Sequence, residues 1–206
     1  MTTLHIRLLA LLMGVFMMFD VHAIAPDPKP EPDTAAEEAE VSRQVEAFHA
    51  SLVAAMNMET HGERQAHLEP QIADLFDLER ISRVSLGRTW GSLSTEDREQ
   101  FSAALFELIV ATYADRFDEF NEQVFTTQKV QSVKRNGYVV RTRVRGKERT
   151  VDLDYFFRNG KVFNVVADGV SDLSLRRADY NQIIKTEGFE ELMAHIKRKT
   201  AEARGL

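Results

Sequence analysis

Two histidines and two glutamates near residue 60 are the first side chains that could do chemistry. His61, His67, Glu59 and Glu63 are all residue types that bind zinc. The spacing of the two histidines does not place both imidazoles on one face of a helix, so they do not form a helical zinc-ligand pair. We therefore predict a solvated loop between two helices here, with no metal site and no cofactor.

Asp152 and Asp154 are a second candidate, because paired carboxylates can act as a general acid and a general base. Both lie in a segment with strand periodicity, where they share a face opposite arginines, and structural ion pairs explain that arrangement more simply. Motifs for a nucleophile elbow, a phosphate-binding glycine loop, a dinucleotide fingerprint and a His-Glu-x-x-His zinc site are absent from the sequence. We predict that the protein is not an enzyme, and an enzyme on the same scaffold is the rival hypothesis.

The composition limits the partners and the sources of stability. The 206 residues include 26 Lys and Arg against 32 Asp and Glu, a net charge of -6, so nucleic acid is not an expected partner. No cysteine is present, which excludes disulfides, thiolate zinc sites and a cysteine nucleophile. With 44% apolar residues the chain can bury a sizeable core, and its stability must come from packing.

The N-terminal residues have the pattern of an export signal followed by a linker. Arg7 precedes the apolar stretch 8–19, and small residues suited to cleavage end at Ala23. As a helix this stretch would cover roughly 18 Å, short of the ~30 Å hydrocarbon core of a membrane. Residues 24–33 contain most of the prolines and favour an extended spacer. We predict a cleavable signal peptide over residues 1–23, a disordered Pro-rich leader over 24–33 and a single domain over 34–206.

Helical periodicity dominates the beginning and the end of the predicted domain. The spacing predicts a helix from Thr34, a second over residues 68–87 with Pro70 in its first turn, and a third that starts after Ser94. A helical tail over residues 176–203 is expected to break at Gly188. The apolar positions that define the first and third helices are Val41, Val45, Phe48, Leu52, Met56, Phe101, Leu105, Leu108, Ile109, Thr112, Tyr113 and Phe117.

Between these helical segments the apolar spacing changes to two, which predicts β-strands. Asn136-Gly137 and Asn159-Gly160 are typical of two-residue hairpin turns, so we predict a four-stranded antiparallel meander with fixed register. The expected cross-strand pairs are Arg135 with Tyr138, Val133 with Val140, Val140 with Tyr155, Thr142 with Leu153, Val144 with Val151, Arg141 with Asp154, Arg143 with Asp152, Arg158 with Lys161, Phe157 with Val162 and Phe156 with Phe163.

One face of this meander is predicted to be apolar and to be covered by the helices, which makes the fold class α+β. The predicted face consists of Val133, Val140, Val144, Val151, Leu153, Tyr155, Phe157, Val162 and Val166.

Several short segments, taken in order, resemble one known family. They are Phe76–Leu78, Leu86–Trp90, Thr112–Ala114, Val165–Ser171, Arg176–Tyr180 and Gly188–Leu192. Over roughly residues 35–199 the chain resembles the MlaC/toluene-tolerance family of periplasmic lipid-binding proteins. The stretch 172–177 is similar to a hopanoid-associated branch of the same architecture.

The resemblance implies a fold, a compartment and partners. The implied fold is cystatin-like or nuclear-transport-factor-like, with an apolar cavity between helices and sheet. Members of the family carry one phospholipid by its acyl chains through the periplasm, between an inner-membrane ABC-type transport complex and an outer-membrane complex, which maintains outer-membrane lipid asymmetry. A hopanoid-associated lipid carrier is the alternative.

The expected cavity lies between the apolar sheet face and the first helices. Its predicted lining is Leu75, Leu105, Ile109, Tyr113, Val140, Val144, Val151, Leu153, Tyr155, Phe157 and Val166, and the candidate head-group or mouth residues are Trp90, Arg176 and Arg177. Two alternatives stay open at this point. The same apolar residues could form a filled core, and the arginines and the tryptophan could be a solvated helix start and a core plug.

Overall fold

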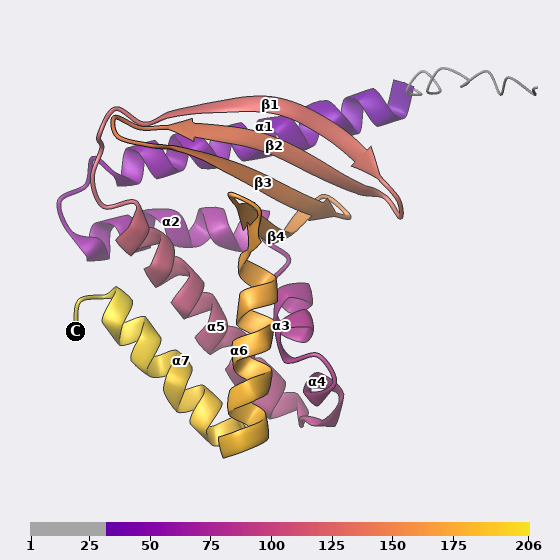
Figure 1. Ribbon diagram of the computed structural model, residues 1–206, viewed down its shortest axis with the longest axis vertical. Helices are drawn as coiled ribbons and strands as arrows, with labels where there is room; N and C mark the ends of the chain where they lie inside the picture. Colours follow the sequence, from indigo (N-terminus) through magenta and orange to yellow (C-terminus); the bar gives the residue numbers. More distant parts are fainter. Residues whose placement is uncertain (1–31) are drawn as a thin grey trace, which may run out of the picture. The chain divides into compact units, whose positions relative to one another are not determined.

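Residues 32–206 are described by a computed structural model, in which helices come first, then a sheet, then two further helices (Figure 1). The predicted signal peptide and nearly all of the predicted leader lie outside the described residues, and Pro32 and Asp33 belong to the first helix. The helices are α1 (Pro32–Ala55), α2 (His61–Leu75), α3 (Leu78–Leu86), α4 (Thr89–Ser92), α5 (Thr95–Arg116), α6 (Asp172–Glu187) and α7 (Phe189–Ala203).

The sheet confirms the α+β class and adds one short strand to the predicted four. Its strands are β1 (Val124–Val133), β2 (Gly137–Arg145), β3 (Thr150–Arg158), β4 (Lys161–Ala167) and β5 (Val170–Ser171), antiparallel and adjacent in chain order. A two-residue strand is too short to show any periodicity, which is why the sequence did not reveal β5.

The predicted register of the middle hairpin is confirmed. Val140 pairs with Tyr155, Val144 with Val151, and Thr142 with Leu153. These pairs place one apolar row on the inner face of the sheet, which the helices cover. The neighbouring pairs of Arg141 with Asp154 and Arg143 with Asp152 are also formed, and they lie on the outer face.

The predicted register of the first hairpin is wrong by three residues, since Val140 pairs with Val130 and not with Val133. The chain turns through three residues between Val133 and Gly137, which pair with each other, and Arg135 and Asn136 both have positive φ. Gly137 is needed for space, because a Cβ there would lie 2.9 Å from Cγ2 of Val133. Since side chains alternate along a strand, this shift moves Val133 to the outer face.

A β-bulge in β4 makes part of the predicted register between β3 and β4 wrong. Arg158 pairs with Lys161 and Phe157 with Val162 as predicted, but Phe156 pairs with Asn164, so Phe163 is the extra residue. Beyond the bulge, Tyr155 pairs with Val165 and Asp154 with Val166. Val165 therefore lies on the inner face, and the prediction for Val166 is wrong.

The helix predicted over residues 68–87 is in fact two helices. Phe76 and Asp77 are not helical, because they run beside β4: Phe76 forms an isolated bridge with Val162, and the amide of Asp77 donates to the Val162 carbonyl at 2.8 Å. Asp77 then caps α3 by accepting from the Arg80 amide. Pro70 lies inside α2 rather than in its first turn.

The predicted loop around the two histidines is also helical. Thr60 and Glu63 form a capping box that begins α2 at His61. His61 Nε2 lies 3.3 Å from the Ala111 carbonyl in α5, and His67 Nε2 lies 3.2 Å from the Ser51 carbonyl in α1. Both histidines thus connect α2 to neighbouring helices.

The helices form a densely packed body below one part of the sheet. α5 packs against α2 and α7, α1 lies along β1 and β2, and α6 leads away from β4 (Figure 1). Phe101 and Leu105 of α5 and Leu192 and Ile196 of α7 are almost completely buried. Helices α1 and α5 confirm the predicted helices that start at Thr34 and after Ser94. The junction of α6 and α7 confirms the predicted break at Gly188.

Candidate functional site

A cavity of about 960 Å³ lies between the inner face of the sheet and helices α3, α5 and α6. The sheet contributes Val144, Val151, Leu153, Tyr155 and Val165. The helices contribute Ile81, Ile109, Tyr113, Leu173 and Arg176, and Phe117 follows the end of α5. A volume of this size is at the upper end of the range for small-molecule sites, roughly 300–1,000 Å³.

The inner end of the cavity is closed by aromatic rings. Phe48 of α1 has its ring centroid 5.5 Å from Tyr113, 5.7 Å from Phe76 and 6.4 Å from Tyr155, all edge to face. Tyr113 also stacks on Phe117 at 5.9 Å, toward the open side. Large rings in these geometries form a rigid wall, because they cannot collapse into the space beside them without losing their edge contacts.

A buried histidine lies directly behind this wall. Nε2 of His49 is 3.0 Å from the hydroxyl of Tyr155, and the imidazole ring lies 4.4 Å from the ring of Phe125. Burial lowers the pKa of His49 to about 4, so the imidazole is neutral at pH 7. Burial, and then the nearby Tyr113, raises the pKa of Tyr155. The closed end of the cavity is therefore uncharged.

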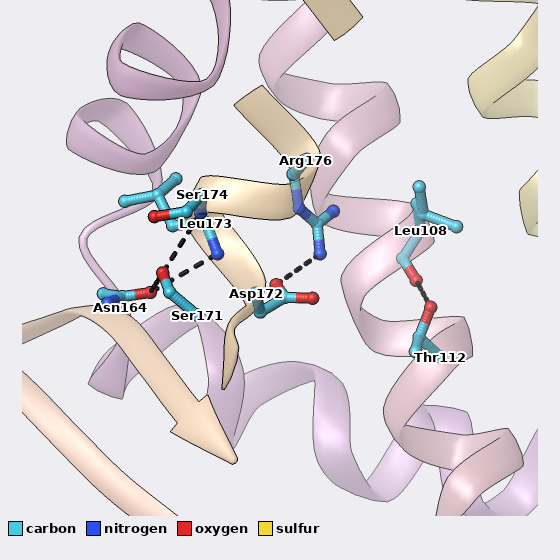
Figure 2. A network of polar contacts seen from close by, with 8 residues as sticks. All are labelled: Leu108, Thr112, Asn164, Ser171, Asp172, Leu173, Ser174 and Arg176. Atoms are coloured by element: carbon cyan, nitrogen blue, oxygen red, sulfur yellow. Dashed lines mark hydrogen bonds and ion pairs between the residues drawn. The ribbon is translucent and has the colours of Figure 1, made fainter. Parts of the chain in front are cut away.

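Asn164 attaches the start of α6 to the sheet at the side of the cavity (Figure 2). Its Oδ1 accepts from the Ser171 hydroxyl at 3.0 Å and from the Leu173 amide at 3.3 Å. The Ser171 hydroxyl in turn accepts from the Ser174 amide and so caps α6. This network positions α6 across the cavity and turns Leu173 and Arg176 toward it.

Arg176 is the main charged group of the cavity wall. Its side chain is only 12% exposed and pairs with Asp172 at 2.7 Å (Figure 2). Burial lowers the pKa of Arg176, but Asp172 and Tyr180 outweigh that effect and raise it, so the guanidinium stays charged. Its buried Nε has no hydrogen-bond partner among the described residues. The pair also borders a second hollow of about 630 Å³ between α5, α6 and α7.

The mouth of the cavity is formed by two loops. One is the tip of the β2–β3 hairpin, Gly146 to Arg149, and the other connects α5 to β1 and contributes Glu119, Asn121 and Gln123. Polar and charged groups gather at this mouth, whereas the deeper walls are mostly apolar. The arrangement can hold an elongated apolar group with a polar end near water.

The structure brings together seven of the predicted site residues and separates the other seven. Ile109, Tyr113, Val144, Val151, Leu153, Tyr155 and Arg176 line the cavity. Leu75, Leu105, Val140 and Phe157 are buried in the packed body instead, and Val166 lies on the outer sheet face. Trp90 packs beside Phe101 and the Arg98 guanidinium, and Arg177 lies next to Gly87, so neither borders the cavity.

Sequence reasoning missed several lining residues. Val165 and Phe163 were hidden by the bulge, which no alternation pattern predicts. Phe76 was treated as part of a continuous helix, although Asp77 is a good N-cap and could have signalled the break. Asn164 sits next to an apolar run, and a polar residue at such a position is a signal for a specific hydrogen-bonding role.

The residues considered for catalysis do not meet at the cavity. Asp152 and Asp154 are on the outer face, 2.7 Å and 3.9 Å from Arg143 and Arg141. The hydrogen bond from Arg143 lowers the pKa of Asp152, and burial raises that of Asp154, but no cavity described here adjoins them. Within residues 32–206, no cluster of three or more potential metal ligands occurs, and no helix is long and apolar enough to span a membrane.

Comparison with known proteins identifies a family and a fold. The family model described as MlaC protein matches residues 45–198. A solved structure of a phospholipid-binding protein from Ralstonia solanacearum, in complex with a phospholipid, superimposes with a TM-score of 0.69 at 20% sequence identity. The alignment covers 81% of this chain and 98% of that one. No curated protein sequence matches significantly.

Proposed function

Because the chain belongs to the MlaC family, we propose that it is a periplasmic lipid carrier that binds a phospholipid by its acyl chains. The observation that carries this proposal is the large apolar cavity between the sheet and α5. The relative from Ralstonia solanacearum, which has the same fold, was solved with a phospholipid. In our proposal the chains lie against Val144, Val151 and Leu153, and the head group stays near the hairpin tip at the mouth.

The physical need for such a carrier follows from the hydrophobic effect. A diacyl lipid has about 30 methylene groups, and at ~0.8 kcal/mol each their full exposure to water costs about 24 kcal/mol as an upper bound. An apolar cavity removes most of this barrier, because moving a chain from hydrocarbon to an apolar cavity is nearly neutral. A carrier of this kind can collect and release lipid without trapping it.

The proposed role includes transient partners but no chemical reaction. We infer that the protein exchanges lipid with an inner-membrane ABC-type transport complex and an outer-membrane complex, and so contributes to outer-membrane lipid asymmetry. The role needs no cofactor and no catalytic residue. The predicted export signal over residues 1–23 fits this location, and its cleavage is part of the proposal.

Native mass spectrometry of the protein purified from a bacterial periplasm tests lipid binding. We expect one diacyl lipid per chain. Leu153→Arg, which puts a charge into the cavity wall, should abolish the lipid adduct while the circular dichroism spectrum stays native. Val166→Arg is the matched control, because it places the same side chain on the opposite face of the same sheet, next to Asp154, and should retain the lipid.

A triterpenoid is the second candidate ligand. The stretch 172–177, which resembles the hopanoid-associated branch, supplies the Asp172–Arg176 pair in the cavity wall. Mass spectrometry of the extracted ligand separates the two candidates, because a diacyl glycerophospholipid and a triterpenoid differ in mass and fragmentation. Protein that is consistently empty would overturn both.

A further inference from the structure

The charges of this acidic protein are strongly segregated. The segment 124–167, which forms β1 to β4, contains ten Lys and Arg against three Asp and Glu, a net charge of +7. The other described residues contain 14 Lys and Arg against 26 Asp and Glu, a net charge of -12. Such a separation gives the sheet a positive potential that the net charge of the chain conceals.

Several of these basic side chains project from the outer face of the sheet, away from the cavity. Arg141, Arg143 and Arg145 alternate along β2, and Lys129 of β1 is opposite Arg141. Asp154 and Asp152 partly neutralise Arg141 and Arg143. Lys129 and Arg145 are exposed and form no ion pair among the described residues, so their charges are available to a partner.

The basic face leads to the mouth of the cavity. Arg145 is the last residue of β2, and the hairpin tip that follows it carries Lys147 and Arg149 at the mouth. Large apolar side chains with unusually high exposure lie in this region. Val170 (52% exposed) and Leu175 (60%) border the cavity, and Phe120 (42%) and Val124 (47%) are next in the chain to the lining residues Glu119, Asn121 and Gln123. Exposed apolar groups next to cations are typical of surfaces that dock at a membrane interface.

The opposite side of the mouth is negatively charged. Asp118, Glu119 and Glu122 lie in the loop between α5 and β1, and Glu148 is within the basic hairpin tip. An anionic surface would therefore attract the sheet side of the mouth and repel the loop side. This asymmetry sets an orientation in which the sheet approaches first.

We propose that the basic outer face of the sheet, with the apolar residues around the mouth, docks the protein on an anionic lipid bilayer. The inference extends the proposed lipid binding, because docking would bring the cavity mouth to the surface from which lipid is taken or to which it is given. Charge complementarity selects an anionic bilayer over a zwitterionic one, since the cations have no role at an uncharged surface.

Vesicle co-sedimentation of the protein purified from a bacterial periplasm tests the proposal. Vesicles of phosphatidylcholine and phosphatidylglycerol in equal parts are compared with vesicles of phosphatidylcholine alone. We expect binding to the anionic vesicles only. It should weaken strongly when salt rises from about 0.1 M to about 1 M, because the Debye length falls from about 10 Å to about 3 Å.

A charge-reversal pair locates the surface. Each basic residue near an anionic membrane contributes roughly fivefold to binding, so Lys129→Glu combined with Arg145→Glu should weaken binding by about 25-fold or more. Neither residue lines the cavity. Lys185→Glu combined with Lys197→Glu is the matched control, because both lysines are exposed on α6 and α7 and the net charge changes equally. The control should bind like the wild type.

Three results would overturn the proposal. They are absence of binding to anionic vesicles at low salt, undiminished binding by the sheet variant, and equal loss in the control. The first of these would direct attention to an acidic protein surface instead. Lipid content measured on the same preparations separates this failure from that of the proposed function, because a protein without lipid can still be scored for docking.

Discussion

Helix α5 and the inner sheet face each have a packed half and a hollow half. Phe101 and Leu105 near the start of α5 are at most 1% exposed, and Val140 and Phe157 in the sheet are equally buried. Further along the same elements, Tyr113 and Phe117, like Val144 and Leu153, face the cavity. The periodicity is the same in both halves. The comparison shows that what an apolar face meets, and not its pattern, decides whether it becomes core or cavity.

The largest effect is expected from truncating two side chains of β3, one in the packed half and one in the hollow half. Phe157→Ala should lower the free energy of unfolding by about 3–5 kcal/mol, because it leaves a cavity in a packed region. Leu153→Ala should cost less than about 2 kcal/mol, since that side chain already borders open space. Urea denaturation of lipid-free protein measures both values. An equal cost at the two positions would mean that the cavity is filled in solution.

The stability of the protein should depend on pH through His49, which lies behind the closed end of the cavity. Its pKa is lowered by burial from 6.5 to about 4, so the unfolded chain binds a proton between these pH values that the folded chain does not. Stability is therefore unaffected above about pH 6.5 and decreases by about 3 kcal/mol as the pH falls toward 4. His49→Gln should remove this part of the acid sensitivity in denaturation curves recorded across that range. A variant with an unchanged slope would refute the assignment.

Enlarging a side chain should have opposite effects in the two halves. Val140→Phe in the packed half is expected to destabilise the protein by about 1–3 kcal/mol, because a dense core cannot accept the added volume. Val144→Phe should leave the unfolding free energy nearly unchanged and reduce the lipid content. Denaturation and native mass spectrometry on the same samples measure both effects, and the reverse outcome would place the cavity elsewhere.

The smallest expected effect concerns the packed end of α5. Ser94 accepts a hydrogen bond from the Asp97 amide at 3.0 Å, and Ser94→Ala should cost about 1 kcal/mol by removing this cap. Lipid content should not change, because the cap lies at the end of the helix away from the cavity. A loss of lipid in this variant would show that the two halves of α5 are coupled.

The sequence was sufficient for most of the architecture, and half of the site residues predicted from it do line the cavity. The middle hairpin was predictable because Arg141 and Arg143 oppose Asp154 and Asp152 in the same register that buries Val144 and Val151. The break at Asp77 was missed although Asp is a good N-cap residue, because the pairing of Phe76 with Val162 that interrupts the helix is long-range. Leu105 and Ile109 occupy equivalent positions of one helical pattern, and only the tertiary structure shows that the first is core and the second borders a cavity.

The single extra residue in β4 has a further consequence for how this chain is aligned with others. Phe163 acts as a phase shift: if it paired with Phe156 instead of bulging, Val166 would turn inward and Val165 outward. A strand without Phe163 and without the bulge would keep Val165 opposite Tyr155 and facing inward. A relative lacking this residue would need a gap at that column. Without the gap, side chains that touch the ligand in one protein would be equated with solvent-facing ones in the other.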